Sequence, residues 1–297
     1  MTKQLITLAF VFGFVSLYGQ DDASLFTRMN AISNHGVDFF NVDGMELTSQ
    51  KVDAEFSRKN ISKKFKHLKI KESELTSSDS SLGFENYYVF KSNEMPKGMF
   101  SNMSYYFIEG VDKKLIAITI ASVNKTDKAL ERQFVRLVKN DSIPKSIYNS
   151  QSTDSLNFAG RKLYLGPSCR WMAINNIQCH SYGQMNWSVH KSQEDALKTV
   201  NDHFRFIQDG NKGKVVSDTT VSVIFENVET TARKIIYDFT GVTSILVGMT
   251  GGKTLTIYFV AAPVRNNFVS CVMSFWNNDN INASGLAPLL EEVMKLK

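Results

Sequence analysis

The stretch Thr254-Leu-Thr-Ile-Tyr-Phe-Val-Ala-Ala-Pro-Val-Arg-Asn-Asn-Phe-Val-Ser-Cys-Val-Met-Ser-Phe-Trp276 decides the fold. From Leu255 to Ala261 every second residue is apolar, the period of a strand whose side chains alternate between two faces. Residues around Pro263 and Arg265 interrupt the run, and a second strand pattern follows over 267–276. This stretch therefore predicts two neighbouring strands joined by a tight turn, which pair antiparallel.

The segments on either side of this hairpin continue the pattern. Further strands are predicted over 219–227, 231–239 and 244–249, and before them Ser192 is expected to cap a helix with an apolar stripe. A closing helix is predicted from about Ser284 to Lys297, because apolar residues recur there at helical spacing. These residues are Leu286, Leu289, Leu290, Val293 and Leu296.

The first half of the chain has a similar order of elements. Strands are predicted over 84–91, 104–108 and 114–123, and a helix over 127–139. A polar, helix-favouring segment is expected to start at Ser49 and to reach Leu68.

The polar segment 140–154 divides the chain into an N-terminal half, 21–150, and a C-terminal half, 151–297. The predicted hairpins at 106–120 and 258–273 resemble each other, because in both an aromatic and aliphatic strand is followed by a turn and a second apolar strand. We therefore weigh a duplicated unit against two unrelated halves.

Strands that follow one another without long crossovers predict the fold class α+β, with a mostly antiparallel sheet flanked by helices. In the order of its elements, segment 184–297 resembles the α/β/α sandwich of the PsbP, Mog1 and DcrB-type superfamily. The resemblance implies a non-catalytic accessory or binding module, and it assigns no functional residue.

The N-terminus has the features of a cleavable signal peptide over residues 1–20. Lys3 precedes an apolar run from Leu5 to Val15, and the segment ends on Gly19 and Gln20. No cysteine occurs before Cys169, so we expect no lipoprotein anchor. No later segment has 18 uninterrupted apolar residues, so no transmembrane segment is expected. These features predict an exported, soluble protein of the periplasm or the extracellular space.

The net charge of the chain bears on the partners that it can bind. The chain carries a formal net charge of +5, too small for a dedicated nucleic-acid binder, so no nucleic-acid partner is expected.

The three cysteines differ in their expected roles. Cys169 and Cys179 are ten residues apart and predict a disulfide in an oxidising compartment. Cys271 lies in an apolar strand and is expected to be a buried thiol.

No segment of the sequence matches the residue types and spacing of a known cofactor, metal or catalytic motif. The Gly-rich segment 248–254 resembles a phosphate-binding loop but has the wrong spacing and is followed by a strand. Cys179, His180 and His190 lack the spacing of zinc ligands, so no metal and no cofactor are predicted. The chain also lacks a Gly-x-Ser-x-Gly elbow.

Three aromatic segments are the predicted places of ligand contact, because tryptophan beside amide and carboxylate groups suits a sugar or a peptide. They are Trp171, Trp187, and Trp276 with Asn278 and Asp279. A basic stretch, 58–71, either is a solvated surface or contacts anionic lipids or glycans.

The leading hypothesis is an exported, non-enzymatic accessory or binding protein of the bacterial cell envelope, with an envelope protein or a glycan as its partner. The alternatives are a secreted hydrolase with a triad that the sequence does not reveal, and a surface protein that binds glycans.

Overall fold

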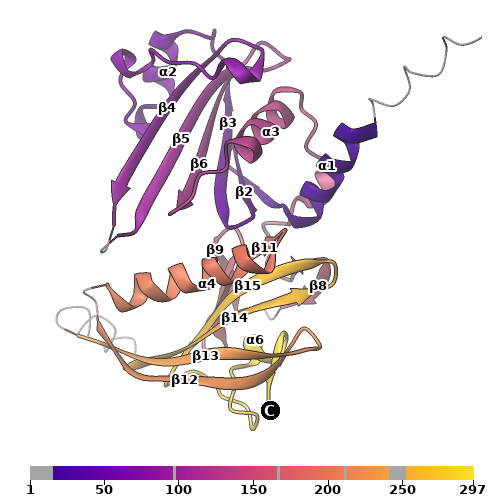
Figure 1. Cartoon of the computed structure of the whole chain (residues 1–297), viewed down its shortest axis with the longest axis vertical. Helices are drawn as coiled ribbons and strands as arrows, with labels where there is room; N and C mark the ends of the chain where they lie inside the picture. The colour runs from indigo at the N-terminus through magenta and orange to yellow at the C-terminus, as the bar shows by residue number, and fades with distance from the viewer. Residues whose placement is uncertain (1–15, 96–97, 166–167, 211–212, 241–251) are drawn as a thin grey trace, which may run out of the picture.

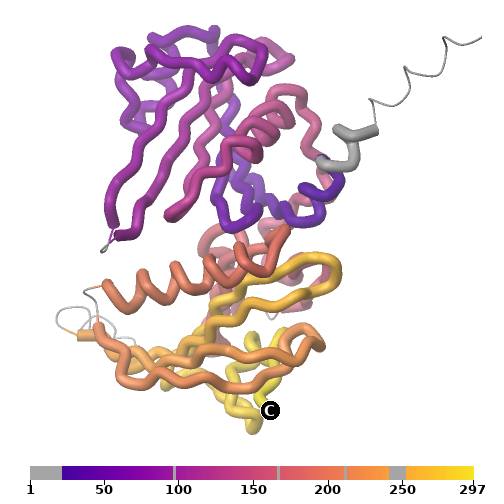
Figure 2. The backbone as a smooth tube through the Cα atoms, viewed as in Figure 1, coloured from indigo at the N-terminus to yellow at the C-terminus, as the bar shows by residue number. Residues whose placement is uncertain are grey.

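A computed structural model describes residues 16–95, 98–165, 168–210, 213–240 and 252–297. The protein is an α+β fold with two halves at opposite ends of the molecule, the N-terminal half uppermost and the C-terminal half below it (Figure 2). Each half is built on its own antiparallel sheet. Within these ranges, none of the helices has the length and apolar content needed to cross a bilayer.

The N-terminal half begins with helix α1 and forms a six-stranded sheet of order β1-β2-β3-β6-β5-β4. Helix α3 and the helical turn η3 pack against one face of this sheet, and α2 with the segment up to Leu75 covers the other (Figure 1). The elements are α1 (Ser16–Arg28), β1 (Asn30–Asn34), β2 (Val37–Val42), β3 (Met45–Val52), α2 (Arg58–Lys64), η1 (Lys66–Leu68), η2 (Glu72–Glu74), η3 (Ser80–Leu82), β4 (Asn86–Glu94), β5 (Phe100–Glu109), β6 (Leu115–Val123), α3 (Lys128–Lys139) and η4 (Lys145–Ile147).

The C-terminal half has an eight-stranded sheet of order β16-β12-β13-β14-β15-β11-β10-β9 and a separate two-stranded hairpin, β7-β8. The predicted hairpin is confirmed as β14 and β15, which pair from Leu255↔Trp276 to Val264↔Asn267. The elements are β7 (Ser155–Phe158), β8 (Arg161–Tyr164), β9 (Cys169–Ala173), β10 (Asn176–Cys179), β11 (Gly183–His190), α4 (Gln193–Gln208), β12 (Gly213–Phe225), β13 (Val228–Phe239), β14 (Thr254–Val264), β15 (Asn267–Trp276), α6 (Pro288–Glu291) and β16 (Met294–Leu296).

The two sheets share one connectivity. In each, a three-stranded meander is followed by a helix and a second meander, whose last strand returns to pair with the third strand of the first meander. A helix follows the second meander in each half, namely the longer α3 in the N-terminal half and the four-residue α6 in the C-terminal half. This common order is the topology that a duplicated unit requires, and a common origin of the halves stays a prediction.

Different elements cover the two faces of the central strands of the C-terminal sheet. Helix α4 uses Ala196, Val200 and Phe204 to cover one face of β13, β14 and β15, where Ile257 and Phe259 lie. The opposite face packs against the β7-β8 hairpin, α6 and β16. Side chains that alternate along β14 therefore enter two separate cores, which explains why both of its faces are apolar.

Two predicted helices are shorter in the structure than the sequence indicated. Ser49 lies in strand β3, opposite Ile118 of β6, and the helix after it starts at Arg58 with Ser57 as its N-cap. The closing helix does not run to the end of the chain, because α6 has only four residues and β16 follows it. β16 pairs with the edge of β12, so backbone hydrogen bonds to the sheet replace those of a longer helix.

Two other predictions have no test in the structure. The strand predicted over 244–249 lies outside the described residues. In the uncleaved chain helix α1 spans Ser16–Arg28, so the predicted cleavage position near Gln20 lies within this helix. Cleavage there would leave the later part of α1 in place, including the buried Leu25 and Arg28.

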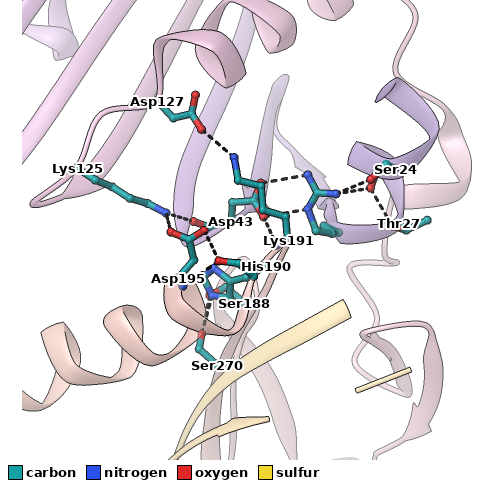
Figure 3. Close-up of polar contacts among 12 residues, drawn as sticks. Ser24, Thr27, Asp43, Lys125, Asp127, Ser188, His190, Lys191, Asp195 and Ser270 are labelled. Atoms are coloured by element: carbon teal, nitrogen blue, oxygen red, sulfur yellow. Dashed lines mark hydrogen bonds and ion pairs between the residues drawn. The ribbon is translucent and has the colours of Figure 1, made fainter. Parts of the chain in front are cut away.

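The turn between β2 and β3 forms a non-covalent contact between the two halves. The carboxylate of Asp43 accepts hydrogen bonds from Arg28 Nε at 2.9 Å and from the backbone amide of Lys191 at 3.1 Å (Figure 3). The backbone of Asp43 donates to Val189 O and accepts from Lys125 Nζ. Because Arg28 and Asp43 are only 8% and 4% exposed, this is a buried ion pair that also holds strand β11 of the other half.

Gly44 completes this turn and allows the close approach. Asp43 and Gly44 both have positive φ, +50° and +75°, which is the geometry of a two-residue hairpin turn in which glycine is favoured. A Cβ on Gly44 would lie 2.9 Å from Thr199 Oγ1 and 3.0 Å from His190 Cε1. The tip of the N-terminal sheet therefore packs directly on α4 and the end of β11.

We expect the Asp43→Ala substitution to destabilise the protein by about 3 kcal/mol, because it leaves the Arg28 guanidinium buried without its counter-ion. Urea unfolding followed by circular dichroism measures the loss. The control is Asp112→Ala, which removes a carboxylate from half-exposed pairs with Lys51 and Lys114 and should cost less than about 1 kcal/mol. Equal losses in the two variants would show that the buried pair does not hold the halves together.

Candidate functional site

A polar pocket of about 410 Å³ opens on the C-terminal sheet, on the face that α4 covers elsewhere, and no residue of α4 lines it. The structure brings three of the predicted ligand residues together here, namely Trp276, Asn278 and Asp279. The remaining lining residues are Arg170, Gln178, Cys179, His180, Ser181, Gly183, Gln184, Leu255 and Ser274. Its volume is that of an ordinary small-molecule site.

A row of polar side chains forms the floor of the pocket. Arg170 pairs with Gln178, Gln178 with Gln184, and Gln184 with Ser274, across four neighbouring strands. Residues paired directly across strands point to the same face, so their side chains stand in line. Arg170 Nη2 donates to Gln178 Oε1 at 3.2 Å, and Gln184 Nε2 donates to Asn176 Oδ1 at 3.1 Å. The floor thus offers amide, guanidinium and hydroxyl groups at strand spacing.

The loop after β15 forms one wall. Asp279 Oδ2 accepts a hydrogen bond from the Trp276 amide at 2.8 Å, and the Asp279 amide donates back to Trp276 O. The amide of Asn280 donates to Ser181 O, which ties this loop to the turn between β10 and β11. Partial burial raises the pKa of Asp279, although the Trp276 amide and His180 oppose the rise. The wall is therefore held by its own hydrogen bonds.

Trp276 supplies the aromatic part of the pocket. Its side chain is half-buried, and its ring lies 5.4 Å from that of Phe239, tilted by 31°. Leu255, its cross-strand partner, lines the pocket beside it. The pocket therefore combines one apolar side with a polar floor.

The other two predicted tryptophans do not line this pocket. Trp187 is 1% exposed and packs 5.4 Å from Phe158, ring to ring, so it belongs to the core and cannot contact a ligand at the surface. Trp171 is half-buried on the opposite face of the sheet, where its indole donates to Ser150 O at 3.1 Å. The prediction that grouped these side chains as ligand contacts is not supported for Trp187.

The predicted disulfide between Cys169 and Cys179 is confirmed. The two cysteines are direct cross-strand partners in β9 and β10, next to the pair Arg170↔Gln178. The bond therefore fixes the register of the hairpin that carries half of the pocket floor. Cys271 is a free cysteine with no exposed surface, as predicted, and burial raises the pKa of its thiol.

Sequence reasoning missed Gln178, Gln184 and Ser274. A partial signal was present, because a bridge between Cys169 and Cys179 in a hairpin places Arg170 opposite Gln178. The pairing of β11 with β15, which adds Gln184 and Ser274, joins segments about 90 residues apart and has no local signal.

The pocket also contains the residue types of a hydrolytic triad. His180, Asp279 and the hydroxyls of Ser181 and Ser274 all line it. A triad needs the histidine to be hydrogen-bonded both to the nucleophile and to the acid. Among the described residues no side-chain hydrogen bond involves His180, and Asp279 is engaged with the Trp276 amide.

A second histidine cluster is buried at the junction of the halves (Figure 3). His190 Nε2 lies 2.8 Å from Ser188 Oγ and 2.9 Å from Ser270 Oγ, and these hydroxyls are 2.8 Å from each other. His190 has no exposed surface, and both serines are less than 5% exposed. A substrate has no access to this cluster, which acts as a polar part of the core.

The part of the chain that the structure describes holds no group of three or more His, Cys, Asp or Glu side chains placed to bind a metal ion.

No family model and no curated protein matches the sequence. Among solved structures, the di-domain ARO/CYC StfQ from the steffimycin biosynthetic pathway covers 93% of this chain and 86% of its own length, with 10% identity and a TM-score of 0.17. DynU16, a putative protein in the dynemicin biosynthetic locus, covers 92% and 82% with 10% identity and a TM-score of 0.19. At these TM-scores the likeness carries no argument about fold or function.

His190 should make stability depend on pH. Burial, together with the nearby charge of Lys125, lowers the pKa of His190 from 6.5 to about 4, against the opposing effects of Asp43 and Asp195. The folded state then binds fewer protons than the unfolded state between these two values. This residue should therefore contribute about 3 kcal/mol above pH 6.5, and the contribution should fall as the pH drops from 6.5 to 4.

Urea unfolding at pH 7 and at pH 4.5 checks this, with His190→Gln and the exposed His35→Gln as variants. The wild type and His35→Gln should lose more stability on acidification than His190→Gln does. Parallel losses in all three proteins would contradict the assignment.

Proposed function

We propose that this protein is an exported, non-enzymatic binding protein of the cell envelope, and that it holds a saccharide in the pocket lined by Trp276 and the row Arg170, Gln178, Gln184 and Ser274. The observation that carries the proposal is this row of hydrogen-bonding side chains, which lies on a part of the sheet face that no helix of the described residues covers.

Several features of the pocket support a saccharide. Gln178 and Gln184 each present a planar amide that can donate and accept, and Arg170 adds donors in a fixed fork. Trp276 offers an apolar surface next to them. A sugar ring has hydroxyls at its edge and C–H groups on its faces, so both kinds of surface find a counterpart in this pocket.

Export is supported by two independent features. The apolar segment between Lys3 and Gly19 has the pattern of a signal peptide. The disulfide between Cys169 and Cys179 suits an oxidising compartment outside the cytoplasm.

A hydrolase is the second candidate, because His180, Asp279 and two serines line the same pocket. The described residues lack the hydrogen bonds that would make these side chains a triad, so binding is the function that the geometry supports better. The two functions differ in one measurable property, which is turnover of the bound saccharide.

We expect Trp276→Ala to weaken saccharide binding at least about tenfold, because it removes the aromatic surface of the pocket. A panel of soluble cell-wall oligosaccharides, tested by isothermal titration calorimetry, gives the affinity. Gln184→Leu should act in the same direction, since it removes two hydrogen-bonding groups from the floor.

The matched control is Trp171→Ala, which alters a half-buried tryptophan on the opposite face of the sheet and should leave binding unchanged. Equal effects of Trp171→Ala and Trp276→Ala, or no binding to any saccharide in the panel, would refute the saccharide site. Release of product that stops in His180→Gln would establish the hydrolase instead.

The exported protein should begin near Asp21. Mass spectrometry of the protein recovered from its own cells gives the mature N-terminus. A chain that retains residues 1–20 would contradict export through signal-peptide cleavage.

A further inference from the structure

The cap of the N-terminal half carries an unusual concentration of positive charge. Segment 58–71, which forms α2, η1 and the residues up to η2, contains seven basic residues and no acidic one. They are Arg58, Lys59, Lys63, Lys64, Lys66, Lys69 and Lys71, called the basic cap below. The rest of the chain has 27 Lys and Arg against 29 Asp and Glu, a net charge of −2, so the basic cap accounts for the positive charge of the whole protein.

The fold places all seven cations on the outside. Ile61, Phe65 and Ile70 are at most 5% exposed and pack onto the N-terminal sheet beneath the cap. These anchors set the orientation of α2 and η1, and all seven basic residues are exposed. The cap lies at the end of the molecule away from the C-terminal half (Figure 1). It can therefore approach a flat surface without interference from the other half.

The charges of the basic cap are not neutralised within the protein. Among the described residues, none of the seven side chains forms an ion pair with an acid. Glu74, three residues after Lys71, is engaged with Lys91 at 2.9 Å and with the backbone amide of Lys71 at 2.7 Å. Seven cations in 14 residues repel one another, and an external anionic surface would relieve this repulsion.

Arg58 adds a feature that suits phosphate. It lines an open pocket of about 550 Å³ together with the hydroxyl-bearing residues Thr76, Ser77, Ser78 and Ser80 and with one carboxylate, that of Glu85. Guanidinium and hydroxyl groups are the usual donors to phosphate oxygens. Phosphate is the anionic group of most phospholipids, whereas acidic glycans often carry carboxylates.

We propose that the basic cap is a docking surface for an anionic phospholipid bilayer, which holds the protein at a membrane by electrostatic attraction alone. Ile61, Phe65 and Ile70 are buried and Leu68 is half-buried against the same core, so the cap presents no fully exposed apolar side chain to the hydrocarbon. The attraction is therefore reversible and screened by salt. This surface lies in the half that does not carry the saccharide pocket, and the inference does not depend on the proposed function.

The test is co-sedimentation of the protein, purified from its own cells with the N-terminus it has there, with vesicles of phosphatidylcholine containing about 30% phosphatidylglycerol. We expect binding to these vesicles at low salt, none to pure phosphatidylcholine, and loss of binding at about 0.5 M salt. No binding to the anionic vesicles at low salt would overturn the proposal.

The variant Lys63→Gln, Lys64→Gln, Lys66→Gln tests the surface itself. Each cation near an anionic bilayer contributes about fivefold in affinity, so the triple variant should bind about 100-fold more weakly. The matched control neutralises three other exposed lysines, Lys145, Lys214 and Lys295, and should reduce binding far less. Circular dichroism and urea unfolding of both variants confirm that they are folded.

Equal losses in the two triple variants would show a general effect of net charge and refute a defined docking surface. A soluble anionic polymer serves as the alternative partner. If the polymer binds with the same dependence on Lys63, Lys64 and Lys66 while the anionic vesicles do not bind, the bilayer is the wrong partner.

Discussion

The buried carboxylate of Asp43 is the interaction on which the arrangement of the two halves depends. It lies at the tip of a hairpin of the N-terminal sheet, yet its hydrogen bonds reach Arg28 in α1 and the amide of Lys191 after β11. A buried carboxylate is unfavourable unless it is paired and fully hydrogen-bonded, so the three elements must meet in one geometry. His190, Ser188 and Ser270 continue this polar junction into the C-terminal half.

The junction also explains where the candidate site can form. Because α4 begins directly after the junction and covers β13, β14 and β15, it occupies the sheet face nearest the N-terminal half. The strands β9 and β10 lie at the far edge of the same sheet and contribute Arg170 and Gln178 to a region that no described residue of α4 reaches. A polar floor is tolerable there because water or a ligand can satisfy it, whereas beneath α4 the same side chains would be buried.

The two halves share a strand order but differ in what they present to the outside. In the N-terminal half the second sheet face is covered by a basic cap, and in the C-terminal half part of one face stays open as a pocket. One architecture thus carries a positively charged surface at one end and a polar pocket in the other half. The two proposals made above therefore place their two binding surfaces on different halves of the chain.

The sequence by itself determined the elements whose signal is local. The alternation from Leu255 to Ala261, the Ser192 cap and the spacing of Cys169 and Cys179 each depend on neighbours within a few residues, and each was predicted correctly. The closing helix failed because Leu286 to Leu296 satisfy a helical period, while the open edge of β12, distant in sequence, offers hydrogen bonds to β16 instead. The residues of the candidate site divide in the same way between those that the sequence indicated and those that only the tertiary structure placed. Trp276, Asn278 and Asp279 were found from their residue types, but only the pairing of β11 with β15 placed Gln184 beside Ser274 and left Trp187 in the core. Long-range strand pairing and burial depend on the whole chain, so only the tertiary structure decided them.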